Sequence, residues 1–303
     1  MMDFSLTIVG VGGVGGVLAG PLLRKYGSAV HLVARGKRGE HLRTNGLTLH
    51  SDVYGEFTAA CESVVEEPAE LPVQDFILVC VKNDALPAVT EQIRAIADEH
   101  TVVVPVMNGV TATSVMAKGN GSVAGSVIYT VSSAGKDFSI TQKGKFTHLF
   151  LEDLGERTEQ LRAIFEGAGI DCRLTGDIRT AIWSKYAFNC AYNTMTAACG
   201  TDAGHLKEEP LRSDFAAILA EAKAVGSADG AKFKEDMVSR ELYRLDKTTD
   251  NSTSSLSRDF DVCRAGEFEV FSGDLVRMAR SFGMETPVMD RYYQILLEKA
   301  KTF

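Results

Sequence analysis

Four glycines near the start of the chain have a spacing that suits the binding of phosphate groups. Gly10, Gly12 and Gly15 form a G-x-G-x-x-G pattern, and Gly13 lies inside it. The apolar run Leu6–Val9 precedes the pattern, so the sequence predicts a strand, a glycine turn and a helix. Such a helix presents the positive end of its dipole and its first backbone N–H groups to an anion. The pattern therefore predicts a site for the pyrophosphate of a dinucleotide.

Arg35 indicates which dinucleotide this site prefers. It stands 20 residues after Gly15, at the end of a second apolar run over residues 29–34. A chain that selects NAD usually has Asp or Glu at this point, where the carboxylate binds the ribose 2′-hydroxyl. Here Lys37 and Arg38 follow Arg35 instead, and no acidic residue lies in the run or beside them. Because a guanidinium fork suits a phosphate, the sequence predicts NADP(H) as the cofactor.

A second candidate site lies on one predicted helix in the second half of the chain. Lys185, Asn189 and Asn193 follow one another at intervals of four residues, so they form one polar row on a helix that is otherwise apolar and aromatic. Taken alone, such a row is more often the solvent face of a helix. The other interpretation is a site for an anionic, oxygen-rich substrate, because the row offers three donors and no carboxylate.

Glu267 is the next candidate for chemistry. It stands at the edge of an apolar helical stripe, which comprises Phe268, Phe271, Leu275, Met278 and Phe282. A lone Glu in this position is usually a carboxylate at the rim of a core. Ser254 and Ser255, just upstream, are by themselves typical of loops and helix caps.

The elements of the first half of the chain alternate between strand and helix. Phe76–Val81 and Thr101–Val106 are fully apolar runs, which indicate buried parallel strands. Lys82 and Asn108 follow the carboxyl ends of these two strands, where the ligands of a doubly wound sheet bind. We therefore expect a Rossmann-type, NADP-binding domain over residues 1–176.

The remaining segments divide into strands that finish this sheet and a run of helices. Residues 121–153 are expected to add two or three strands to the sheet, followed by a helix over Glu156–Gly167 and a short strand over Ile170–Leu174. After residue 176 the pattern is helical throughout. The predicted helices span residues 177–199, 206–228, 233–249, 256–282 and 287–301. The fold class is therefore α/β, with an all-α domain over 177–303 that carries the substrate and catalytic residues.

The composition is that of a globular protein, and the net charge limits which partners are expected. The 303 residues are 45% hydrophobic and 24% charged, with a formal net charge of −8, which argues against a nucleic-acid or acidic-membrane partner. The long apolar helices after residue 176 are compatible with a homodimer or with a single domain core. The uncharged segment Phe4–Leu23 contains six glycines and Pro21, so we expect neither a membrane span nor a signal peptide.

Cysteine and histidine usage predicts neither disulfides nor a metal site. The six cysteines contain no C-x-x-C pair, and no grouping of Cys, His and Asp has metal-site spacing. We expect the cysteines to be small buried hydrophobic residues in a reducing compartment, and the protein to be cytoplasmic.

The order of these features resembles the ketopantoate reductase (2-dehydropantoate 2-reductase) family over essentially the whole chain. The matching features are the glycine turn with Arg35, Lys82, Asn108-Gly109, Trp183-Ser-Lys185-x-x-x-Asn189-x-x-x-Asn193, and Ser254-Ser255-Leu-x-x-Asp259 followed by Glu267 and Gly273. The polar row, in this place after a dinucleotide fold, favours the substrate-site interpretation over the solvent-face one.

The resemblance implies a role for each candidate residue. Lys185 is expected to be the general acid that protonates the ketone oxygen, and Glu267 to bind the substrate hydroxyl and help place Lys185. The expected ligands of the substrate's carboxylate and hydroxyl are Asn189, Asn193 and Ser255. Asn108 and Lys82 are expected beside the ribose and nicotinamide end of the cofactor.

The implied reaction is the NADPH-dependent reduction of 2-dehydropantoate to D-pantoate, in pantothenate and coenzyme A biosynthesis. The chain departs from the usual family pattern at Met107 in place of Gln, Leu256 in place of Met, Gly266, Phe268 and Glu269 around Glu267, and Ser272 in place of Asn. Most of these positions are near the predicted substrate residues. The alternative is therefore a related NAD(P)-dependent 2-oxoacid reductase or D-2-hydroxyacid dehydrogenase of the same fold.

Overall fold

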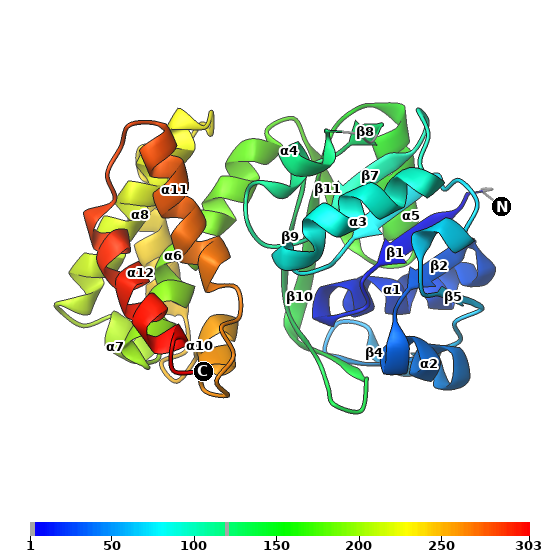
Figure 1. Cartoon of the computed structure of the whole chain (residues 1–303), viewed down its shortest axis with the longest axis horizontal. Helices are drawn as coiled ribbons and strands as arrows, with labels where there is room; N and C mark the ends of the chain where they lie inside the picture. The colour runs from blue at the N-terminus through cyan, green and yellow to red at the C-terminus, as the bar shows by residue number, and fades with distance from the viewer. Residues whose placement is uncertain (1–3, 119–120) are drawn as a thin grey trace. The chain divides into compact units, whose positions relative to one another are not determined.

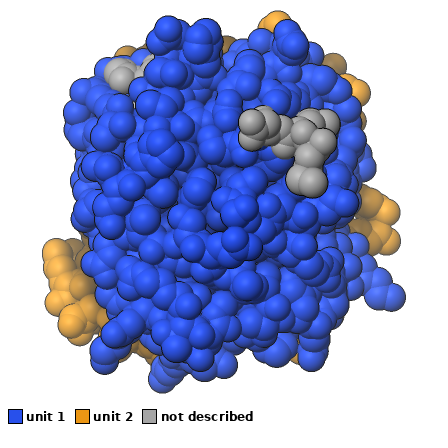
Figure 2. Space-filling model, turned by 90° about the vertical axis from the view of Figure 1, so that its right-hand side faces the viewer, with its two compact units in different colours: residues 1–178 blue, residues 179–303 orange. Residues whose placement is uncertain are grey.

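Two units make up the chain, residues 1–178 and residues 179–303. The computed structural model describes residues 4–118 and 121–303. Figure 1 traces the helices and strands, and Figure 2 gives each unit its own colour. The division falls two residues after the boundary expected at residue 176. Below, these parts are called the first unit and the second unit.

A six-stranded parallel sheet forms the centre of the first unit. Its strands lie in the order β5-β2-β1-β6-β7-β8. Their bounds are Leu6–Val9 (β1), Val30–Val33 (β2), Ser63–Val65 (β5), Phe76–Val79 (β6), Val102–Pro105 (β7) and Ser122–Val123 (β8). Strands β1, β6 and β7 are buried along their whole length, as the unbroken apolar runs of β6 and β7 predict.

Alternating side chains of these strands enter two separate cores, so both faces of the sheet are covered. Ile8 and Leu78 pack in one core, whereas Val9 and Val79 pack in the other. The helices of the first unit are Gly13–Tyr26 (α1), Gly36–Asn45 (α2), Leu86–Gln92 (α3), Ala112–Met116 (α4) and Glu156–Gly167 (α5). Short 3₁₀ turns span Gly27–Ala29 (η1), Pro68–Glu70 (η2), Asn83–Ala85 (η3) and Ile93–Ile96 (η4). The predicted doubly wound, Rossmann-type sheet is confirmed.

A second, five-stranded sheet corrects one expectation. Its strands are Leu47–Ser51 (β3), Gly55–Ala59 (β4), Ser126–Ala134 (β9), Ile140–Glu152 (β10) and Asp171–Thr175 (β11). The sequence predicted that residues 121–153 would finish the first sheet, but only the short β8 does so. Strand β9 pairs antiparallel with β10, and β10 pairs parallel with β3 and β11.

Helix α1 explains why a second sheet forms here. The helix is buried from Gly15 to Leu23, so it has apolar neighbours on more than one side. Gly16 and Gly20 face this sheet: a Cβ atom would lie 2.5 Å from Ile140 at the first position and 2.9 Å from Leu49 at the second. These glycines let the helix lie against the second sheet while its other side packs on the first.

The second unit is helical, as predicted, and residues 179–303 contain no strand. Its elements are Ile178–Cys199 (α6), Ala203–Leu206 (α7), Leu211–Ala228 (α8), Met237–Lys247 (α9), Ser255–Phe260 (α10), the π-helix Glu269–Gly273 (η5), Asp274–Ser281 (α11) and Pro287–Ala300 (α12). Trp183, Phe215 and Phe271 are fully buried in this unit.

Two helices that the sequence predicted as continuous are interrupted. The segment 206–228 breaks between α7 and α8 at Pro210, which has no N–H group and disfavours the helical conformation of the residue before it. The segment 256–282 breaks after Phe260, and Gly266 in the connection has a φ of +59°. The second break matters for the site because it isolates Glu267 from α10.

Two burial expectations were also wrong. Cys199 and Cys263 are exposed, although Cys172 and Cys190 are buried as expected. Phe282, the last member of the predicted apolar stripe, is 43% exposed, because it lies just past the end of α11.

Residues 4–118 and 121–303 contain no helix that is long and apolar enough to cross a membrane. Within the same ranges, no group of three or more His, Cys, Asp or Glu side chains is arranged to hold a metal ion.

Candidate active site

The glycine turn of the first unit has the geometry of a close approach between helix and strand. Gly10 has a φ of +92°, which favours glycine, and a Cβ atom on Gly15 would lie 2.0 Å from the carbonyl oxygen of Gly10. Gly12 is the N-cap of α1, and a Cβ atom there would meet no atom within 4 Å. The space beside Gly12 at the N-terminus of α1 is therefore open, where backbone N–H groups could meet an anion.

Arg35 stands at the end of β2 as the N-cap residue of α2. Its Nη2 donates to Glu67 Oε2 at 2.9 Å and to Gln92 Oε1 at 3.1 Å. The Arg35 side chain is 56% exposed, so this ion pair is screened by water and contributes little stability. The guanidinium of Arg38 lies over Phe138 instead, with its carbon 5.2 Å from the ring centroid.

Lys82 and Asn108 lie at one edge of the first sheet. Val79 at the end of β6 pairs with Pro105 at the end of β7. Lys82 follows Val79 by three positions, and Asn108 follows Pro105 by three positions. The Asn83 side chain donates to the Asn108 carbonyl oxygen at 3.0 Å, which ties the two strand ends together. This is the edge that carries Gly10 and Arg35, because β1, β2, β6 and β7 are parallel.

The polar row on α6 is not a fully exposed face. Lys185 and Asn189 are half-buried, and Asn193 is buried with 6% of its surface exposed. Ser255, at the start of α10, donates from its hydroxyl to Asn193 Oδ1 at 3.3 Å. The structure therefore brings together two residues that stand 62 positions apart in the sequence.

Ser254 has a structural role beside this contact. Its hydroxyl oxygen accepts the Ser257 N–H at 3.0 Å and so caps α10. It also accepts a hydrogen bond from the Thr196 hydroxyl at 2.7 Å. These bonds fix the start of α10 on α6, and thereby place Ser255.

Lys185 is held in an environment that makes it a stronger acid. Burial and, to a smaller extent, the guanidinium of Arg244 lower the pKa of Lys185 to about 8, against the opposing effect of the Glu267 carboxylate. The Glu267 carboxylate therefore lies within electrostatic range of Lys185. An ammonium with a pKa near neutrality is charged at pH 7 and still gives up its proton readily.

The π-helix η5 positions Glu267 just before it. The Glu267 carbonyl accepts the N–H groups of Val270 and Phe271 at 3.0 and 3.2 Å. The Tyr186 hydroxyl donates to the Val270 carbonyl at 2.6 Å, and the hydroxyls of Thr194 and Ser272 lie 2.8 Å apart. Two buried hydrogen bonds thus fasten η5 to α6. Single-turn π-helices are frequent at functional sites.

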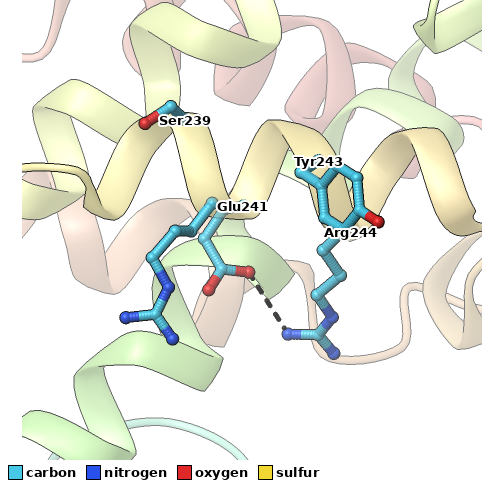
Figure 3. A pocket seen from close by; sticks show the side chains of 5 residues that line it. Ser239, Glu241, Tyr243 and Arg244 are labelled. Carbon is cyan, nitrogen blue, oxygen red and sulfur yellow. Dashed lines mark hydrogen bonds and ion pairs between the residues drawn. The ribbon is translucent and has the colours of Figure 1, made fainter.

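Arg244 is a candidate that the sequence did not reveal. It lies on α9 and borders a hollow of about 420 Å³, which is lined by Ser239, Arg240, Glu241, Tyr243 and Arg244. Figure 3 shows Arg244 and Glu241 on the same side of α9, with Arg244 Nη1 3.4 Å from Glu241 Oε2. The sequence carried no signal for Arg244, because its guanidinium reaches α6 only in the folded chain, where its carbon lies 4.0 Å from the ring centroid of Phe188.

Several departures from the family pattern fall on residues that pack or pair within the second unit. Phe268 and Leu256 are buried. Glu269 accepts the Tyr293 hydroxyl at 2.8 Å and binds Arg277 at 2.7 Å. These residues serve the structure around Glu267.

Comparison with known proteins gives matches to two family models and to curated relatives. The family model described as ketopantoate reductase PanE/ApbA matches residues 6–153, and the one described as its C-terminal part matches residues 177–300. A 2-dehydropantoate 2-reductase of Mesorhizobium japonicum is 28% identical over 312 aligned positions, which cover 94% of each chain.

Solved structures share the fold of the chain. A PanE/ApbA family ketopantoate reductase from Ralstonia eutropha has a TM-score of 0.90 at 24% identity, covering 98% of this chain and 99% of that one. A D-mandelate dehydrogenase, solved with NADH and anilino(oxo)acetate, has a TM-score of 0.86 at 18% identity, covering 98% of each chain. At these identities the likeness shows the fold alone. With both family models matched across its two units, the chain belongs to the ketopantoate reductase PanE/ApbA family, whose members are pyridine-nucleotide-dependent oxidoreductases acting on a ketone or alcohol group.

Proposed function

We propose that the chain reduces the ketone of 2-dehydropantoate to the alcohol of D-pantoate with NADPH, in pantothenate and coenzyme A biosynthesis. The observation that carries this proposal is the half-buried Lys185, with a pKa lowered to about 8, within electrostatic range of Glu267. Family membership supports the reaction class, and the curated relative from Mesorhizobium japonicum has this activity as its name.

The first unit supplies the cofactor site in this proposal. Gly10, Gly12, Gly13 and Gly15, with the N-terminus of α1, hold the pyrophosphate through backbone N–H groups. Arg35 exchanges its exposed partner Glu67 for the 2′-phosphate, to which it can donate two parallel hydrogen bonds. Lys82 and Asn108 bind the ribose and nicotinamide end. When bound, the reduced nicotinamide supplies a hydride to the ketone carbon.

Lys185 supplies the proton. As the ketone carbon is reduced, the carbonyl electron pair moves onto the oxygen, which becomes negatively charged. The ammonium of Lys185 stabilises that charge and then transfers its proton, so that the alcohol forms and Lys185 is left neutral. Glu267 binds the substrate hydroxyl and keeps Lys185 in place. Asn189, Asn193 and Ser255 hold the polar groups of the substrate.

A second candidate is the reduction of a different 2-oxoacid by the same chemistry. The departure at Gly266 favours it, as does the fold shared with D-mandelate dehydrogenase. Three other departures do not argue against 2-dehydropantoate. Phe268 and Leu256 are buried and Glu269 is paired with Arg277, so these residues serve the packing of the unit and not substrate choice. We therefore keep 2-dehydropantoate as the first candidate.

The test is NADPH consumption by the full chain, followed by absorbance, with a panel of 2-oxoacids and with NADH in parallel. We expect 2-dehydropantoate to give the highest kcat/KM, and NADPH to be preferred over NADH. Faster turnover of phenylglyoxylate or 3-methyl-2-oxobutanoate favours the second candidate. Binding of NADPH without oxidation by any 2-oxoacid contradicts both, and points to a protein that binds the nucleotide without turnover.

The assembly state is a separate part of the proposal. The apolar side chains of α8, among them Phe215, Ile218 and Leu219, are buried within the second unit of one chain. A single core therefore accounts for them, and a homodimer stays a prediction. Sedimentation velocity at two concentrations tests it.

A further inference from the structure

The π-helix η5 lies between Glu267 and helix α11. At its end the Asp274 N–H donates to the Glu269 carbonyl, five residues earlier, whereas an α-helix would bond four residues back. One residue is therefore inserted in the turn that joins Glu267 to α11. Because each residue of a helix turns the chain by about 100°, this insertion sets the direction in which Glu267 projects from the helix end.

Arg277 binds both ends of this five-residue hydrogen bond. The Glu269 carboxylate accepts Arg277 Nη1 at 2.7 Å, and the Glu269 carbonyl accepts Arg277 Nη2 at 3.4 Å. The same Nη2 donates to Asp274 Oδ1 at 2.7 Å. From α12, the Tyr293 hydroxyl donates to the second carboxylate oxygen of Glu269 at 2.8 Å. The guanidinium of Arg277 thus joins the two residues between which the π turn closes.

Gly273 leaves the space that this arrangement needs. It is buried, and a Cβ atom there would collide with the Glu269 carboxylate and lie 2.8 Å from Arg277 Nη1. Glycine within a helix costs stability relative to alanine. The φ of Gly273 is −62°, which any residue adopts, so its backbone conformation does not require glycine. The contact between Glu269 and Arg277 does.

This contact is a weak source of stability. The side chains of Arg277 and Glu269 are 52% and 46% exposed, so water screens their charges. An exposed ion pair for which a helix keeps a glycine is better explained by its effect on the geometry of η5. We propose that Arg277, by binding Glu269 over Gly273, is a positioning residue that fixes the π-helix and so sets the direction of Glu267 relative to Lys185. This inference rests on the proposed function, in which Glu267 and Lys185 form the catalytic pair.

The experiment measures the proton affinity of Lys185 directly. Full chains of wild type and Arg277→Gln are isotope-labelled at the lysine Cε atoms, and the signal that Lys185→Ala lacks is titrated by NMR. We expect a lower midpoint in Arg277→Gln, because the Glu267 carboxylate, which raises the pKa of Lys185, is displaced. Loss of a positive charge by itself would raise the midpoint, so a fall reports the displacement of Glu267.

Arg280→Gln is the matched control, since it removes a guanidinium of the same helix, one that pairs with Asp290 at 3.0 Å. We expect its midpoint to equal that of wild type. Gly273→Ala takes the place of Arg277→Gln if that variant does not fold. It displaces the carboxylate over Gly273 without removing a charge, and alanine favours the helix, so the midpoint should fall without a loss in melting temperature.

Turnover gives a second readout. With 2-dehydropantoate and NADPH, we expect kcat/KM of Arg277→Gln to fall about 10- to 100-fold, because a misplacement of about 1 Å in a catalytic group can cost this much. A wild-type midpoint or wild-type turnover in Arg277→Gln, or an equal shift of the midpoint in Arg280→Gln, overturns the inference and leaves the proposed function intact. If wild type reduces no 2-oxoacid, the proposed function fails, and the midpoint, which needs no substrate, decides the inference by itself.

Discussion

The hydroxyl of Tyr186 donates a hydrogen bond of 2.6 Å to the carbonyl of Val270. Tyr186 is the neighbour of Lys185 on α6, and Val270 lies in the π-helix that begins two residues after Glu267. The bond is buried, and burial raises the pKa of Tyr186 well above its usual value, so the hydroxyl stays a donor. It therefore joins the two segments that carry the proposed catalytic pair.

Tyr186→Phe is expected to disturb catalysis through Glu267. The change leaves the buried Val270 carbonyl without its partner, at a cost of about 1–3 kcal/mol in the free energy of unfolding. Because Glu267 raises the pKa of Lys185, its displacement lowers the pH at which kcat/KM declines. Tyr192→Phe is the control. Tyr192 lies on the same helix as Tyr186, and the change removes its 3.0 Å hydrogen bond to the Ser252 carbonyl, which is outside that helix. Similar pH profiles in both variants contradict a positioning role for Tyr186.

The pH dependence of turnover should follow the proton on Lys185. Lys185 must be protonated to act as the acid, so kcat/KM declines as pH rises through about 8. Removing the charge of Arg244 shifts this decline to higher pH, because that guanidinium lowers the pKa of Lys185. Glu267→Gln shifts it to lower pH, because the carboxylate raises that pKa. Shifts in the reverse directions are incompatible with Lys185 as the titrating acid, and Lys185→Ala should cost about 10²- to 10⁴-fold in kcat.

Arg35→Ser should change the choice of cofactor and little else. We expect KM for NADPH to rise about 10- to 100-fold, because a charge-assisted bidentate contact is lost, while KM for NADH stays the same. Because the ion pair between Arg35 and Glu67 is exposed to water, its loss should change the free energy of unfolding by less than about 1 kcal/mol. Arg43→Ser is the control, because Arg43 is an exposed arginine of α2 that pairs with Glu66. Equal losses with NADPH and NADH in Arg35→Ser exclude a 2′-phosphate contact.

Two alanine substitutions in the glycine turn should separate an effect on folding from an effect on cofactor binding. Gly15→Ala puts a Cβ atom 2.0 Å from the Gly10 carbonyl oxygen, so we expect unfolding to become easier by about 2 kcal/mol or more. Gly12→Ala meets no atom within 4 Å, so the melting temperature should hardly change. The methyl group instead occupies the space proposed for the pyrophosphate, and NADPH binding measured by fluorescence should weaken. A Gly12→Ala protein with native NADPH affinity would place the phosphates elsewhere.

Features that depend on neighbours in the sequence could be predicted from the sequence. The strand, glycine turn and helix from Leu6 to Tyr26 are where the pattern placed them, because strand and helix periodicity and backbone sterics are local. The row of Lys185, Asn189 and Asn193 lies on one helix for the same reason. Glu267 was already a candidate from its place beside an apolar stripe, and the family resemblance added Ser255 and a role for each of them, although their partners in space were not readable.

Tertiary structure decided what depends on which segments meet. Strands β9 and β10 looked like the rest of the first sheet, yet they form a second one, since strand pairing is a long-range contact that residue types leave open. The bond from Tyr186 to Val270 spans 84 positions, and Arg244 reaches Phe188 across a helix packing. The pKa of Lys185 is the sum of such contacts, because desolvation and Coulomb interactions depend on distance in space. The sequence by itself therefore predicted which groups could do the chemistry, and only the fold set the charges and hydrogen bonds around them.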